Sequence, residues 1–151
     1  MIELCHREIA GRAVTVVATE RPDGDMHPLN VDPATLATRQ LATTSRTWLM
    51  LDQVHGATVH HVTGDVPVGS IAGVGDVISA ECPERAIAIW AADCAPLVLI
   101  DDSARVIGCH AGWRGLAAGV VDVALARSST PTVAVLGPCV HPCCYEFGEL
   151  E

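Results

Sequence analysis

The sequence predicts a single α+β domain spanning residues 1–151, and two observations support this expectation. The chain is 50% hydrophobic and 18% charged, so it has enough apolar side chains for a core and does not have the composition of a disordered chain. Short apolar segments rich in β-branched residues recur along it, whereas only two segments are predicted to be helical. Strands therefore outnumber helices in a chain of one domain's length.

The predicted strands are short apolar stretches bounded by Gly, Pro, Asp or Asn. They cover residues 13–19, 47–51, 57–63, 76–80, 86–92, 97–101, 105–109 and 132–136. Residues 21–33 and 64–75 are rich in residues that break strands and helices, so we expect loops there.

Asp32 is expected to cap a first helix over residues 33–43, because its side chain suits the N-cap position and Pro33 is tolerated at the first helical position. In this helix Leu36 and Leu41 are expected to face the core, with Arg39 and Gln40 more exposed. A second helix is predicted over residues 112–127. Its 3.6-residue period is carried by Trp113, Leu116, Val120, Val123 and Ala124.

The charge balance argues against nucleic acid as a partner. Nine Arg and no Lys stand against eighteen acidic residues, a net charge of −9, and phosphate binding needs the opposite sign. No apolar run reaches the roughly 18 residues of a membrane span, and no signal peptide is recognisable. Seven Cys without a secretion signal disfavour a disulfide framework. We therefore expect a cytoplasmic protein with no membrane partner.

Three residues at the ends of predicted strands carry metal-binding or catalytic chemistry. They are His55 in QVHG, Cys94 in ADCAP, and His110 in GCHAGWRG. Read singly, each has a plainer alternative: a surface histidine, a buried small hydrophobe, or a strand-turn-helix junction with a surface arginine. A sheet that brings them to one edge would offer two imidazoles and one thiolate, the ligand pattern of a catalytic zinc site with an open fourth position. The spacing alone does not identify such a site.

The GCHAGWRG segment also has the features of an anion site. Glycines at a predicted helix N-terminus allow close approach to backbone N–H groups, and Arg114 adds a fixed charge. The later segment GPCVHPCCYE contains Cys139, His141, Cys143 and Cys144. Structural zinc sites draw on separated ligand pairs, so we interpret this segment as a loop lining the cleft instead.

Four separated motifs carry a family resemblance. The strings QVHG, AADCAP, CHAGWRGLAAGV and LGPCVHPCCYEFG resemble, in order and spacing, the multicopper polyphenol oxidoreductase family, also described as laccase-domain or YfiH-like. The resemblance implies a four-layer α/β/β/α sandwich related to the cytotoxic necrotizing factor fold. It also implies that His55, Cys94 and His110 are the catalytic metal ligands, with zinc as the usual metal and copper as the alternative.

The same resemblance implies a purine nucleoside phosphorylase acting on adenosine, inosine, guanosine or methylthioadenosine with phosphate, and deaminating adenosine as a second activity. Arg114 would then hold phosphate. Arg39 matches half of an Asn-Arg pair in the family, because Thr38 precedes it. Asp76 matches an acidic residue that positions an imidazole or a ribose hydroxyl, and Asp93 flanks the cysteine with a similar role.

Two departures from the family pattern bear on these expectations. The Gly-rich N-terminal segment of the family is missing or collapsed into residues 23–30, and family members continue beyond the CYE motif. We therefore expect a fold incomplete at its C-terminus, with unpaired strand edges that favour pairing with a second copy. The alternatives are a copper polyphenol oxidase, a non-catalytic metal-binding module, and a Cys-His hydrolase or deamidase of the peptidoglycan-precursor editing type, with Cys94 as nucleophile and His110 as base.

Overall fold

The structure is a computed structural model that describes residues 1–80 and 84–145. Its strands are β1 (Ile2–Ile9), β2 (Arg12–Ala18), β3 (Trp48–Asp52), β4 (Val59–Val62), β5 (Ile71–Val74), β6 (Val77–Ala80), β7 (Ala86–Ile87), β8 (Ala95–Asp101), β9 (Val106–Ala111) and β10 (Pro131–Leu136). Its α-helices are α1 (Pro33–Thr44), α2 (Trp113–Ala117) and α3 (Val120–Leu125), and residues 21–23 and 142–144 form short 3₁₀ turns.

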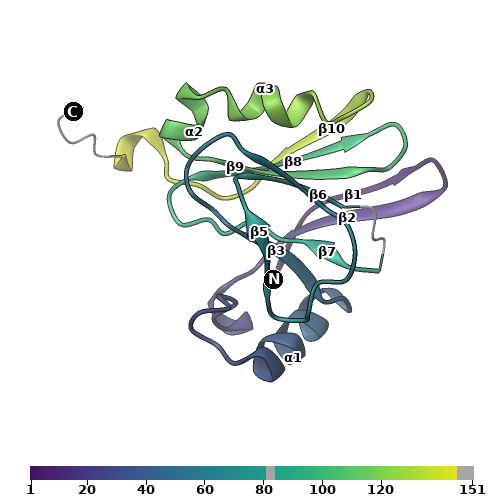
Figure 1. Ribbon diagram of the computed structural model, residues 1–151, viewed down its shortest axis with the longest axis vertical. Helices are drawn as coiled ribbons and strands as arrows, with labels where there is room; N and C mark the ends of the chain where they lie inside the picture. Colours follow the sequence, from purple (N-terminus) through teal and green to yellow (C-terminus); the bar gives the residue numbers. More distant parts are fainter. Residues whose placement is uncertain (81–83, 146–151) are drawn as a thin grey trace.

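The strands form two sheets and a separate hairpin. One sheet has the order β10-β8-β9-β6-β4, the other has the order β5-β3-β7, and β1 pairs only with β2. Helices α2 and α3 cover the outer side of the five-stranded sheet, and α1 covers the outer side of the three-stranded sheet (Figure 1). This arrangement confirms the predicted α+β class and the α/β/β/α layers.

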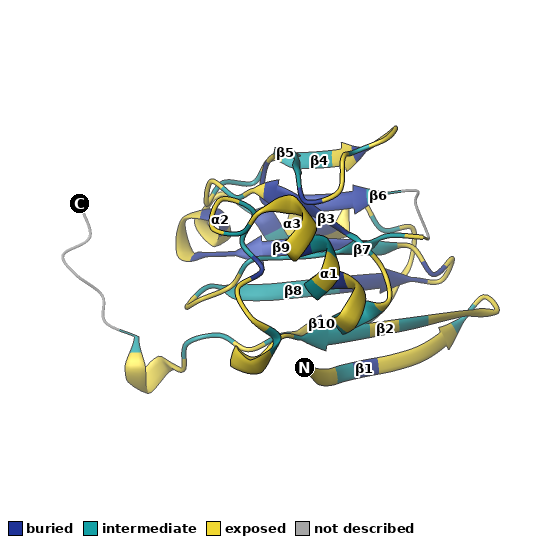
Figure 2. Ribbon diagram, turned by 90° about the horizontal axis from the view of Figure 1, so that it is seen from below, coloured by how far each residue is buried: buried dark blue, intermediate teal, exposed yellow. Residues whose placement is uncertain are grey.

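Each interface between layers has its own apolar cluster. The first, around Val77, Ile107 and Val120, joins the five-stranded sheet to α3. The second, around Leu36 and Met50, joins α1 to β3, and the third joins the two sheets through Leu49, Leu51, Val62 and Ile78. Strand β3 supplies alternate residues to the last two clusters because successive side chains point to opposite faces. Figure 2 shows the buried residues concentrated on the central strands β3, β6 and β9.

Helix α1 confirms the predicted cap but not every predicted face. Asp32 accepts hydrogen bonds from the Ala34 and Thr35 backbone N–H groups at 3.2 and 3.0 Å. Leu36 is fully buried, whereas Leu41 is 49% exposed and Gln40 is buried, so the expectations for those two residues were wrong. Gln40 is buried because its Oε1 accepts the Trp48 backbone N–H at 2.9 Å, which ties α1 to β3.

The predicted helix over residues 112–127 is two short helices. Gly119 adopts a positive φ of 80° between α2 and α3, a conformation that ends one helix and that glycine tolerates best. Trp113 and Leu116 are 41% and 53% exposed, so the predicted apolar stripe was wrong for α2. Val120 and Ala124 on α3 are fully buried, as expected.

Three strand predictions also differ from the structure. The hairpin strand β1 was not predicted, and β5 lies within the segment predicted as the loop 64–75. The predicted strand over residues 86–92 is confirmed only at Ala86–Ile87. Its continuation follows a different path because the Gln53 side chain accepts the Trp90 backbone N–H at 2.8 Å and donates to the Trp90 carbonyl at 2.9 Å.

No helix among the described residues has both the length and the apolar character needed to cross a membrane.

Asp101 lies at the end of β8, far from the candidate site. Replacing it therefore tests what stabilises the fold without changing the site. Its buried carboxylate accepts hydrogen bonds from the Ser103 side chain at 2.6 Å and from the Ser103, Arg105 and Ser129 backbones. Burial alone raises the pKa of Asp101, but these hydrogen bonds outweigh burial and hold the pKa below its ordinary value. We expect Asp101→Ala to lower the free energy of unfolding by about 2–4 kcal/mol in urea titrations, because buried donors lose a charged acceptor.

The lowered pKa of Asp101 also predicts the direction in which the free energy of unfolding changes with pH. A lowered folded-state pKa means that the stabilisation is present above the unfolded pKa of about 4 and is lost as the pH falls through the folded value. Urea titrations between about pH 2 and pH 6 therefore show a steeper loss of stability in the parent chain than in Asp101→Ala. Asp102→Ala, at the exposed neighbour, is the control; equal pH profiles for the parent chain and Asp101→Ala would contradict this account.

Candidate metal centre

Strand register brings the three predicted donors together. Pro96 pairs with His110 and Ala95 with Ala111 across β8 and β9, so Cys94 comes next to the end of β9. His55 lies in the loop after β3. The donor atoms of His55, Cys94 and His110 all lie within 4.8 Å of one another, and the two imidazole rings meet edge to face with centroids 4.8 Å apart. In this cluster His55 is exposed, Cys94 is partly buried and His110 is buried.

Asp76 connects His110 to the loop that carries His55. It immediately precedes β6, and its Oδ1 lies 2.9 Å from His110 Nδ1. Its two carboxylate oxygens also accept the backbone N–H groups of His55 and Gly56 at 2.9 and 2.7 Å. An ionised carboxylate only accepts hydrogen bonds, so His110 Nδ1 carries the proton and Nε2 is the nitrogen left for a metal.

The backbone of His55 has a left-handed conformation, with φ 61°. This conformation is uncommon for a residue other than glycine, and it is found where the surrounding structure enforces it. Here the enforcing contact is the Asp76 carboxylate, which holds the N–H groups of both His55 and Gly56. The turn presents the His55 ring toward Cys94 and His110 while the chain continues to β4.

Gly112 leaves the space that the donors occupy. A Cβ atom at this position would lie 2.9 Å from Cys94 Sγ and 3.0 Å from the His55 ring carbon Cδ2. The backbone of Gly112 is extended, with φ −77° and ψ 162°, so any residue is conformationally allowed there. The glycine is therefore required by the donor cluster and not by the backbone.

The donor Cys94 and its neighbour Cys109 on β9 differ in environment. Burial raises the pKa of the Cys94 thiol, and the charges of Asp93 and Asp76 raise it further. Cys109 points to the opposite face of β9, into the α3 cluster, where burial and then Asp76 raise its pKa to about 11. A metal-free nucleophilic cysteine needs a lowered pKa, so this setting fits a thiolate that is generated by binding a cation.

The donor set fits a zinc ion. Two imidazoles and one thiolate are ligands that zinc prefers, and three protein ligands leave one coordination position for water or substrate. Together with the space left by Gly112 and the Asp76 contact, the chemistry of the cluster supports metal binding.

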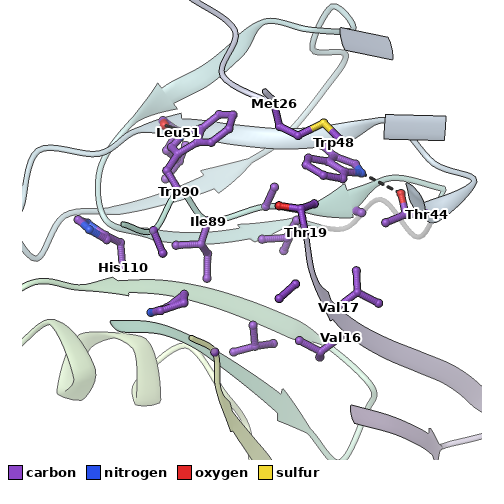
Figure 3. Close-up of a pocket in the computed structure, with 18 of the residues that line it drawn as sticks. Val16, Val17, Thr19, Met26, Thr44, Trp48, Leu51, Ile89, Trp90 and His110 are labelled. Carbon is purple, nitrogen blue, oxygen red and sulfur yellow. Dashed lines mark hydrogen bonds between the residues drawn. The ribbon is translucent and has the colours of Figure 1, made fainter. Parts of the chain in front are cut away.

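The cluster lies where two cavities meet. A large cavity of about 2230 Å³, between the β1–β2 hairpin and the two sheets, is lined by His110 and by His55, Asp93 and Cys94. A second cavity of about 460 Å³ shares those last three residues and adds Trp113, Arg114, Cys144 and Tyr145. Figure 3 shows His110 and Trp90 among the residues that line the large cavity.

The remaining predicted site residues have different positions. Arg114 lines the small cavity, with its guanidinium carbon 4.5 Å from the Trp113 ring centroid. Asp93 is exposed and lines both cavities. Of the two roles expected for Asp76, contact with an imidazole or with a ribose hydroxyl, the structure fits the first, because its side chain is 0% exposed and both of its oxygens have protein donors.

Arg39 is not among the residues that line either cavity. Its Nη1 donates to the Asp25 carbonyl at 2.6 Å, so it holds the loop before α1. The predicted anion site at a helix N-terminus is also weakened, because α2 has only five residues and a short helix has a small dipole. Of the cysteines in residues 139–144, none joins the donor cluster, and Cys144 lines the small cavity as a cleft-lining loop would.

Comparison with known proteins identifies the family of this chain. Residues 24–150 match the family model described as multi-copper polyphenol oxidoreductase laccase. The chain therefore belongs to this family, and the resemblance carried by its four motifs is confirmed.

Particular relatives come from several bacteria. A purine nucleoside phosphorylase of Pseudomonas aeruginosa is 37% identical over 102 residues, which are 65% of this chain and 40% of that protein. The purine nucleoside phosphorylase YfiH of Escherichia coli is 34% identical over 102 residues, 65% of this chain and 41% of that protein. The solved YfiH structure from Bacillus licheniformis superposes with a TM-score of 0.62 at 27% identity, over 83% of this chain and 56% of that one. The chain thus spans about two fifths of the length of the curated relatives it matches.

Proposed function

We propose that this chain carries the metal centre and the substrate cavities of a purine nucleoside phosphorylase, with zinc as the metal. The observation that carries the proposal is the cluster of His55, Cys94 and His110, whose donor atoms lie within 4.8 Å at the junction of two cavities. The relatives named as purine nucleoside phosphorylases support the substrate class.

The reaction joins a phosphate oxygen to C1′ of the ribose as the bond from C1′ to the purine nitrogen breaks. The electron pair of that bond goes to the base, which takes up the proton that hydrogen phosphate releases. A zinc ion held by His55, Cys94 and His110 would supply a Lewis acid that stabilises negative charge on a substrate oxygen or nitrogen. The chain's own residues bind and orient the two reactants on either side of this centre.

Arg114 is the residue that we assign to phosphate. Its planar guanidinium offers paired N–H donors to phosphate oxygens, and its contact with the Trp113 ring limits its motion. The small cavity has room for phosphate beside His55 and Cys94. Asp93, which lines both cavities, is placed to accept a hydrogen bond from a ribose hydroxyl.

We expect Arg114→Ala to raise the KM for phosphate about tenfold or more and to leave the metal content unchanged, because a charge-assisted contact is lost outside the donor cluster. Steady-state kinetics with inosine at saturation measure the change. Arg127→Ala on the exposed chain after α3 is the matched control. An unchanged KM for phosphate in Arg114→Ala would remove Arg114 from the proposed site.

The metal is tested by elemental analysis of the purified chain and of Cys94→Ala. We expect about one zinc per chain in the parent and almost none in the variant, because two imidazoles alone bind zinc weakly. Cys109→Ala is the control, since Cys109 faces the α3 cluster. Copper in place of zinc would correct the metal, and equal zinc in Cys94→Ala would contradict the ligand assignment.

The activity is tested with inosine or adenosine plus phosphate. Phosphorolysis releases the free base and ribose 1-phosphate, whereas deamination of adenosine gives inosine and ammonia, so the products separate the two reactions. Absence of both reactions in the zinc-loaded chain would contradict the proposed function. Fast alkylation of Cys94 that zinc does not slow would favour the metal-free hydrolase instead.

A further inference from the structure

The large cavity contains an aromatic pair that the metal centre does not use. The rings of His27 and Trp90 lie with centroids 4.9 Å apart and planes tilted by 38°. Both residues are half-buried, and both line the cavity that also contains the metal donors. In Figure 3 the Trp90 side chain lies among the cavity-lining residues together with Leu51 and Met26.

Trp90 is held rigidly by the same segments that carry the donors. Its indole N–H donates to the Leu51 carbonyl at 3.1 Å. The Gln53 side chain forms hydrogen bonds with both the backbone N–H and the backbone carbonyl of Trp90. Gln53 precedes His55 by two residues, and Trp90 precedes Cys94 by four. Part of the ring packs on the cluster around Met26 and Trp48, so the contact surface left to the cavity has a fixed orientation.

His27 adds a hydrogen-bond donor to this surface. Its Nδ1 lies 3.2 Å from the Leu29 backbone N–H and accepts from it, which leaves the ring proton on Nε2. The Asp25 carboxylate fixes the His27 backbone N–H at 2.8 Å, and Arg39 holds the Asp25 carbonyl. A flat apolar face, a ring N–H donor and a rigid frame are what a purine base requires, because every base has a π-face and edge acceptors.

We infer that His27 and Trp90 form the wall of the large cavity on which the purine base of the substrate stacks, whereas Arg114 lines the small cavity. This inference rests on the proposed function and adds to it the base-binding subsite. The two cavities then hold the two reactants of phosphorolysis on separate sides: the base in the large cavity and phosphate in the small one. The ribose lies between them at the donors, where C1′ exchanges one bond for the other.

The test uses the zinc-loaded chain with hypoxanthine as the probe, in equilibrium dialysis without phosphate. We expect His27→Ala and Trp90→Leu to weaken hypoxanthine binding about tenfold, the effect of losing one base-stacking partner. Trp90→Phe keeps an aromatic face and should stay within about threefold of the parent chain, whereas His27→Phe keeps the face but loses the ring N–H donor and should bind between the parent and His27→Ala. His6→Ala, an exposed histidine on β1 outside both cavities, should bind as the parent does. Thermal melts check that each variant folds.

Kinetics with inosine separate this inference from the proposed function. The alanine and leucine variants should raise the KM for inosine about tenfold and leave the KM for phosphate unchanged. Hypoxanthine affinity and KM that stay at parent values in both variants would overturn the inference while leaving the phosphorylase proposal in place. Failure of the parent chain to bind hypoxanthine would also overturn it. Stacking-dependent binding without any phosphorolysis would support the subsite and contradict the proposed reaction.

Discussion

Replacing Asp76 by asparagine is expected to lower zinc affinity about 10- to 100-fold, the range for groups that orient metal ligands. The carboxylate accepts hydrogen bonds from the His110 ring and from two backbone N–H groups of the His55 turn. An amide keeps one acceptor oxygen and puts an NH₂ group against the remaining donors. His110 then loses the contact that keeps its proton on Nδ1, and the His55 turn loses part of its support.

The measurement is zinc competition with a chromophoric chelator on the folded chain. Asp52→Asn is the matched control, since Asp52 is an exposed carboxylate three residues before His55 and does not belong to the donor cluster. Asp76→Glu keeps the charge but not the reach, so we expect an intermediate affinity. Zinc binding by Asp76→Asn equal to that of the parent chain would show that Asp76 does not orient the site.

Substitutions of Asp76 also distinguish its contribution to metal binding from its contribution to folding. Its side chain is fully buried, so Asp76→Ala leaves three donors without an acceptor and should lower the free energy of unfolding of the metal-free chain by about 3–5 kcal/mol. Asp76→Asn should lower it less, because one acceptor remains. Urea titrations with and without zinc therefore distinguish loss of the metal from loss of the fold.

Local sequence signals predicted the elements that local chemistry controls. Asp32 and Pro33 located the start of α1, and short apolar stretches rich in β-branched residues located β8, β9 and β10. The donors were candidates because each comes at the end of a predicted strand, and the family resemblance then assigned them as metal ligands. The sheet register brings Cys94 beside the end of β9. For these features the determining contacts lie within a few residues or between neighbouring strands.

The features that were missed depend on contacts between distant segments. Gln53 and Trp90 are 37 residues apart in sequence, and their hydrogen bonds turn residues 88–92 away from a strand path. Gln40 is polar, so its sequence favours exposure, but the Trp48 N–H gives it a buried partner. Periodicity also cannot distinguish one helix of 16 residues from two short ones that Gly119 separates, because both bury Val120 and Ala124. No sequence signal indicated that His27 would lie against Trp90.

The four-layer arrangement explains why the site tolerates a polar cluster in an apolar chain. The donors lie at the rim of the sheets, where β9 ends and α2 begins, and not in the apolar cluster between the sheets. His110 is buried, so the polar nitrogen of its ring needs Asp76 as a hydrogen-bond partner. His55 is exposed, so only its backbone has to be held in place. Burial thus determines which donor depends on a side-chain partner.

Gly112→Ala is expected to abolish most zinc binding while preserving the fold. The added methyl carbon would lie 2.9 Å from Cys94 Sγ and 3.0 Å from the His55 ring, closer than carbon approaches these atoms without displacement. Cys94 Sγ and the His55 ring must then shift away from the methyl group. Because the Gly112 backbone is extended, alanine adds no backbone strain, so the effect should be confined to the donors.

A double-mutant cycle identifies the clash as the cause. In the metal-free chain Gly112→Ala should lower the free energy of unfolding by about 1–3 kcal/mol, the range for inserting a methyl group into a packed site. In the Cys94→Ala background the sulfur is gone, so the same change should be less destabilising, with a coupling of about 0.5 kcal/mol or more. Urea titrations of the four chains measure this coupling, and zinc titration measures the metal loss. If the two free-energy changes are additive and Gly112→Ala binds zinc as well as the parent chain does, the methyl group is accommodated without moving the donors. Gly112 would then have no part in shaping the metal centre.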